Sequence, residues 1–114
     1  MKNKFEKNLR IINELMNYIY KLGAKNININ FNEEDTSTNF VIWGNITSLS
    51  EEKLDELKLK LNTERIHEVE EYYWHLGGDS EIGEELSLIG MMIDKADIKL
   101  ENGSLYIKIS RNDF

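Results

Sequence analysis

The chain has 114 residues, and its 21 acidic against 14 basic side chains give a net charge of −7. This length predicts one domain over residues 1–114, and the acidic balance without a basic run excludes nucleic acid as an expected partner. The chain has no cysteine, which excludes disulfides and thiolate metal sites, and its apolar runs are too short for a membrane span, so we expect a cytoplasmic protein that does not bind membranes.

The first predicted element is an amphipathic helix. Between residues 5 and 22, apolar side chains recur at three- and four-residue spacing, which places them on one face of a helix. Gly23 follows directly and is typical of the residue that ends a helix.

Two strands are predicted next. Residues 26–32 alternate asparagine with apolar side chains, which is typical of a strand with one wet face. Residues 40–46 predict a second strand, antiparallel to the first, in which Gly44 marks a bulge or a close backbone approach.

The middle of the chain is predicted to be helical. Ser50, followed by two glutamates, favours a helix start, and the apolar pattern changes phase around Asn62 and Thr63, which predicts two helices or one bent helix. Gly77 and Gly78 are expected to end this helical region. A further helix then follows, and its internal Gly90 is expected where a neighbouring backbone packs close.

The chain is predicted to close with a hairpin. Asn102-Gly103 is the dipeptide favoured by a type I′ turn, and this turn sets Ile98 opposite Ile107. The expected fold class is α+β, with helices packed on one face of a mixed, mainly antiparallel sheet in the order α-β-β-α(α)-α-β-β. One core is expected to contain Ile27, Ile29, Phe31, Ile42, Leu86, Ile89, Ile93, Ile98, Leu100, Leu105 and Ile107.

This order of elements resembles the ATPase domain of histidine kinases, the Bergerat fold. Asn13 and Asn17 stand one helical turn apart and match the family's asparagine box, which implies amides that coordinate the magnesium of Mg-ATP. The segment Gly83-Glu84-Glu85-Leu86-Ser87-Leu88 resembles the family's second glycine box, with Glu85 at its second glycine. Gly44 matches one glycine of the first box.

The departures from the family pattern concern nucleotide binding. Ile42 stands where the family has the aspartate that recognises adenine, and Glu85 brings negative charge to the phosphate cradle, where like charges repel. The resemblance therefore implies a diverged, non-catalytic module without a bound cofactor. The alternative is an active kinase domain in which Asn13, Asn17, Gly44 and Gly83 bind Mg-ATP and Glu14 acts as a base.

Other candidate sites favour simpler interpretations. His67-Glu68 matches the start of a phosphoacceptor box but lacks the helical hairpin that carries it in the family, so a solvated helix residue is expected. His67 and Glu71 stand four residues apart, as do Glu71 and His75, a spacing that could hold a metal on a helix face, but each pair lacks a third ligand in reach, and we expect no metal site.

Consecutive aromatic residues favour a protein interface. Tyr72, Tyr73 and Trp74 cannot all face one core from a helix, because neighbours are about 100° apart. We therefore expect Trp43, Tyr72 and Trp74 to lie at a contact with a protein partner or in a homodimer.

Overall fold

The computed structural model describes residues 3–73 and 82–112 of the chain. The elements occur in the order α-β-β-α-α-α-β-β, which confirms the predicted order and the α+β class. Their bounds are α1 Lys4–Lys21, β1 Ile27–Glu33, β2 Ser37–Asn45, α2 Glu51–Leu61, α3 His67–Tyr73, α4 Ile82–Gly90, β3 Lys95–Glu101 and β4 Ser104–Asn112.

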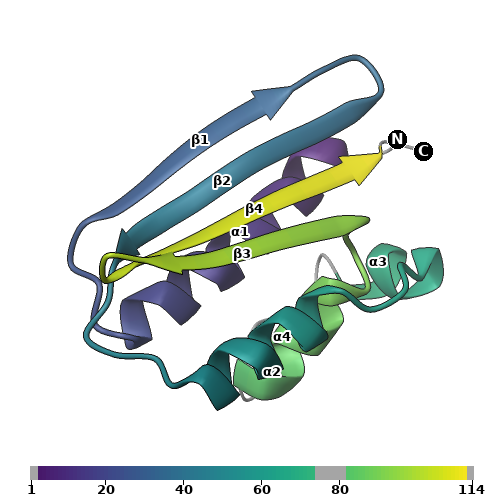
Figure 1. Cartoon of the computed structure of the whole chain (residues 1–114). Helices are drawn as coiled ribbons and strands as arrows, with labels where there is room; N and C mark the ends of the chain where they lie inside the picture. The colour runs from purple at the N-terminus through teal and green to yellow at the C-terminus, as the bar shows by residue number, and fades with distance from the viewer. Residues whose placement is uncertain (1–2, 74–81, 113–114) are drawn as a thin grey trace.

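The four strands form one sheet in the order β1-β2-β4-β3. All three pairings are antiparallel, so the sheet is more uniform than the expected mixed one. The helices lie on one face of the sheet, and no described element covers the other, open face (Figure 1). Helix α1 packs against β1 and β2, whereas α2 packs against α4 and β3. The start of α1 and the end of β4 lie at the same end of the domain (Figure 1).

The residues at the ends of the helices and in the closing turn have the conformations expected from the sequence. Gly23, with φ of 103°, follows α1. The side chain of Ser50 accepts a hydrogen bond from the backbone N–H of Lys53 and caps α2. In the closing turn both Asn102 and Gly103 have positive φ, as a type I′ turn requires, and Ile98 pairs with Ile107.

The core lies between the helices and the covered face of the sheet. Side chains of every second residue in the central strands point into it, among them Phe40, Ile42, Leu105, Ile107 and Ile109. Two of the expected core residues do not belong to it: Ile29 is 40% exposed and Leu100 is 37% exposed. Both lie on edge strands, where the helices cover the sheet less completely than at its centre.

Gly90 lies where α4 meets α2. A Cβ atom at this position would collide with the backbone carbonyl of Lys60 and approach Thr63 Oγ1 at 2.9 Å. The predicted close approach is confirmed, and the two helices can pack at this distance only because residue 90 has no side chain.

Candidate functional site

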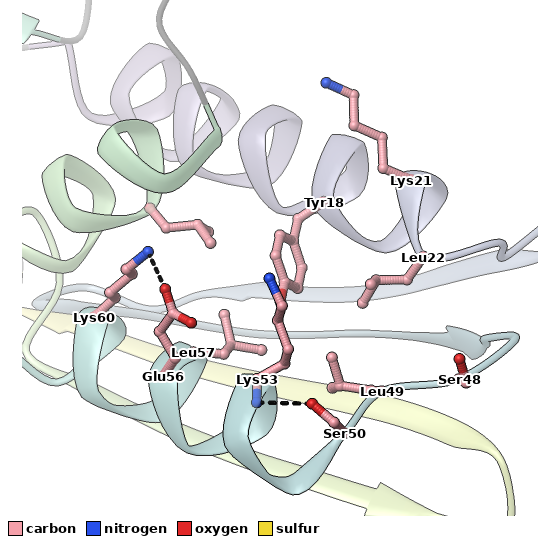
Figure 2. Close-up of a pocket in the computed structure, with 11 residues that line it drawn as sticks. Tyr18, Lys21, Leu22, Ser48, Leu49, Ser50, Lys53, Glu56, Leu57 and Lys60 are labelled. Atoms are coloured by element: carbon pink, nitrogen blue, oxygen red, sulfur yellow. Dashed lines mark hydrogen bonds and ion pairs between the residues drawn. The ribbon is translucent and has the colours of Figure 1, made fainter.

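A pocket of about 580 Å³ opens between the C-terminal half of α1, the segment before α2, and α2 itself. Leu22, Leu49, Leu57 and Leu86 form apolar parts of its lining. The Tyr18 ring points from α1 towards α2 (Figure 2). This volume is within the usual range of about 300–1,000 Å³ for small-ligand sites.

The charged side chains of the pocket are mostly basic. Among the described residues, Lys21, Lys53 and Lys60 line it together with one carboxylate, Glu56 (Figure 2). Lys60 Nζ lies 2.8 Å from Glu56 Oε1, one helical turn away on α2. The pocket thus combines an apolar lining with net positive charge, although the whole chain carries −7.

Two pocket residues have shifted pKa values. The pKa of Tyr18 is raised above 10.0, first because burial disfavours the phenolate and second because the Glu56 carboxylate repels it. The hydrogen bond and the charge of Lys60 lower the pKa of Glu56 below 4.5. Glu56 therefore stays ionised near neutral pH, and Tyr18 remains a neutral hydrogen-bonding group.

A second polar cluster is buried near the start of α1 and the end of β4. At its centre, Arg111 Nη2 donates a hydrogen bond to Glu70 Oε1 across 2.5 Å, and both side chains are at most 1% exposed. Arg65 Nη2 donates to the same oxygen at 2.9 Å. Lys7 Nζ lies 3.5 Å from the other oxygen, Glu70 Oε2, so one carboxylate faces three cations.

Lys7, Arg65 and Arg111 each have further partners besides Glu70. Lys7 also pairs with Glu71, and Arg65 Nη1 donates to Asp94 Oδ2 at 2.7 Å. Arg111 additionally donates to the side chain of Asn8 and to the Met92 carbonyl. Three cations therefore meet three carboxylates, the buried Glu70 and the more exposed Glu71 and Asp94, in one ion network that ties α3 to α1 and β4.

The buried cluster was not predicted from the sequence, although one signal was present. Arg111 continues the inward alternation of Leu105, Ile107 and Ile109 in β4, so it faces the core side. A charged residue in this position requires buried partners. The partner Glu70 has no comparable local signal, because it stands among other acidic residues of α3.

The proposed nucleotide residues do not gather at the pocket. Asn13 and Asn17 are exposed on α1 and are not among the residues that line it. Glu14 is half-buried and lies 3.6 Å from Arg10. Gly44 is buried in β2, where a Cβ would approach the Asn26 carbonyl at 2.8 Å. Gly83 lies in the first turn of α4.

The aromatic interface candidates are only partly described. Trp43 lies on the open face of the sheet, half-buried and stacked on Tyr106 with ring centroids 6.3 Å apart. Tyr72 lies in α3, but its side chain and all of Trp74 and His75 fall outside the description. His67 is exposed, and the described residues contain no group of three potential metal ligands.

No protein-family model matches the chain, and a comparison with curated proteins gives no match either. Within residues 3–73 and 82–112, no helix is both long and apolar enough to cross a membrane.

Proposed function

We propose that the chain is a non-catalytic cytoplasmic binding module, a diverged relative of histidine-kinase-type ATPase domains, with a regulatory role. Its pocket receives a segment of a protein partner in which acidic side chains alternate with apolar ones. The order of the elements supports the family part of this proposal.

The charge of the pocket carries the proposal. Lys53 and Lys60 of α2 and Lys21 of α1 line the pocket together with the leucines, and the Lys21 ammonium group is directed away from the other lining side chains (Figure 2). Among the described residues that line the pocket, Glu56 is the one carboxylate, and it is already paired with Lys60. An acidic chain repels other acidic molecules over a distance, so a local cluster of lysines selects where an anion can dock. The leucines of the same lining favour an apolar side chain next to that anion.

A fluorescent peptide of alternating leucine and glutamate tests the proposal by anisotropy. We expect it to bind more tightly than the same peptide with glutamine in place of glutamate. Exchange of Lys21, Lys53 and Lys60 for Gln should weaken binding of the acidic peptide at least about tenfold, since each lost charge contact contributes to affinity.

A matched variant controls for the change in net charge. Lys95, Lys99 and Lys108 lie exposed on β3 and β4, outside the pocket, and their exchange for Gln alters the total charge by the same amount. At physiological ionic strength this variant should bind within about twofold of the wild type. Equal losses in both variants, or equal binding of the two peptides, would contradict the proposal.

A nucleotide is the second candidate ligand, because lysine ammonium groups also fit phosphate oxygens. The missing aspartate and Glu85 argue against it, and we expect Mg-ATP and Mg-ADP to give no shift in melting temperature at millimolar concentration. A ligand present at 100 times its Kd would stabilise the fold by about 2.7 kcal/mol. A saturable shift that is lost in Asn17→Ala would favour the kinase-like alternative.

A further inference from the structure

The two edge strands of the sheet differ in the number of charged side chains that they carry. Edge strand β3 carries four charged side chains within seven residues, Lys95, Asp97, Lys99 and Glu101, and charged side chains on an edge strand disfavour its pairing with another strand. Edge strand β1 reads Ile-Asn-Ile-Asn-Phe-Asn-Glu and carries one charge, at Glu33. The outer edge of β1 thus lacks the charges that protect β3.

An exposed apolar stripe on α1 borders this edge. Phe5, Leu9, Met16 and Tyr20 stand one or two helical turns apart, which places them on one side of α1, and are between 37% and 56% exposed. The Phe5 ring meets the Phe31 ring of β1 edge to face at 6.2 Å. On the same side of β1, Ile29 is also exposed. The Phe5–Phe31 contact thus joins the helix stripe to the edge strand.

The charges at the two ends of β1 are opposite. Lys25 precedes the strand and is exposed, with its Nζ 4.8 Å from the centre of the Tyr20 ring. Glu34 and Asp35 follow the strand and are also exposed. A twofold axis at the middle of β1 would bring Lys25 of each copy to Asp35 of the other, so this edge is complementary to itself.

We propose that β1 pairs antiparallel with β1 of a second copy of this chain, around a twofold axis at Asn30. In this register Asn28 lies opposite Asn32 on the open face, and Ile29 lies opposite Phe31 on the helix side. The two sheets join into one eight-stranded sheet, and the α1 stripes face each other beneath it. The charged ends fix the register, because a shift along the strand would separate Lys25 from Asp35.

Sedimentation velocity over a range of protein concentrations tests this pairing. We expect the wild type to form a concentration-dependent dimer. Asn30→Lys places two like charges on the twofold axis and should raise the dimer Kd at least about tenfold. Asn30 is exposed, so circular dichroism should show an unchanged fold. The control Asn112→Lys makes the same exchange at the exposed end of β4 and should leave the Kd unchanged.

The helix stripe and the charged ends provide independent tests. Leu9→Gln should weaken the dimer, whereas Leu59→Gln on α2, at a residue that is 75% exposed, should not. Lys25→Glu and Asp35→Lys should each weaken the dimer, and the double exchange should restore it. Restoration requires the two residues to meet across the interface, which a general effect on the fold would not produce.

Three results would overturn the proposal. They are a wild type that stays monomeric at several hundred micromolar, a dimer unaffected by both Asn30→Lys and Leu9→Gln, or a dimer that Trp43→Ala disrupts while the β1 exchanges do not. The last result would place the contact on the open face of the sheet. None of these outcomes depends on the pocket, so they leave the proposed ligand unaffected.

Discussion

Arg111, near the end of strand β4, and Glu70, in the short helix α3, form an ion pair with almost no exposure to solvent. Each also has a further ionic or hydrogen-bonding partner, Arg65 for Glu70 and the Met92 carbonyl for Arg111. Charges in such an environment stabilise a fold only while every member of the cluster keeps its partner.

Glu70→Ala should therefore destabilise the fold by about 3–5 kcal/mol, because it leaves buried cations without their shared carboxylate. Urea unfolding followed by circular dichroism measures the loss. Glu68→Ala, in the exposed first turn of the same helix, is the control and should change the free energy of unfolding by less than about 0.5 kcal/mol.

The double variant Glu70→Met with Arg111→Met should lose less stability than the sum of the two single variants. Lys7 keeps Glu71 and Arg65 keeps Asp94 after both central charges are removed, so no cation is left unpaired. We expect a coupling energy of about 1–3 kcal/mol between the two positions. Strictly additive losses would show that the central pair does not act as a unit.

The turn and the register of the closing hairpin were predictable because residues that are neighbours along the chain determine them. Asn102 and Gly103 accept positive φ, and once the turn is fixed the alternation of side chains leaves one register. The helix start at Ser50 and the break after Leu61 were predictable for the same reason. In each case the deciding interaction lies within a few residues along the chain.

The buried ion cluster and the pocket were not predictable in this way. Lys7, Glu70 and Arg111 come from three distant segments, and no local pattern shows that they meet. The exposure of Ile29 has a similar cause, since alternation shows which side of β1 it faces but not how far the helices extend over that edge. Burial at a sheet edge depends on tertiary packing.

Gly90→Ala should destabilise the fold by about 1–3 kcal/mol, because the new methyl group meets the Lys60 carbonyl and pushes α2 away from α4. In an exposed helix the same exchange would stabilise by about 1 kcal/mol, so the two effects have opposite signs. Thermal unfolding by calorimetry decides between them. A raised melting temperature would show that the two helices can move apart at little cost.

The pH dependence of stability should report on Tyr18. Its folded pKa is raised above 10.0 by burial and by the Glu56 carboxylate, so the unfolded chain releases this proton first as the pH rises. The stabilisation is complete below pH 10 and is lost as the pH rises through the folded pKa. Tyr18→Phe should therefore flatten the alkaline decrease in the free energy of unfolding.

Two further variants separate the causes of this shift. Tyr20→Phe, at an exposed tyrosine of the same helix, controls for the loss of a phenol and should alter the alkaline decrease less than Tyr18→Phe does. Glu56→Gln removes the smaller cause and should lower the pKa of Tyr18 only in part, because burial remains. The chain has five tyrosines, so the difference in tyrosinate absorbance with and without the Tyr18→Phe exchange isolates the titration of Tyr18. A Tyr18 that titrates at or below 10.0 in the wild type would show that its hydroxyl is open to water and is not enclosed by the pocket wall.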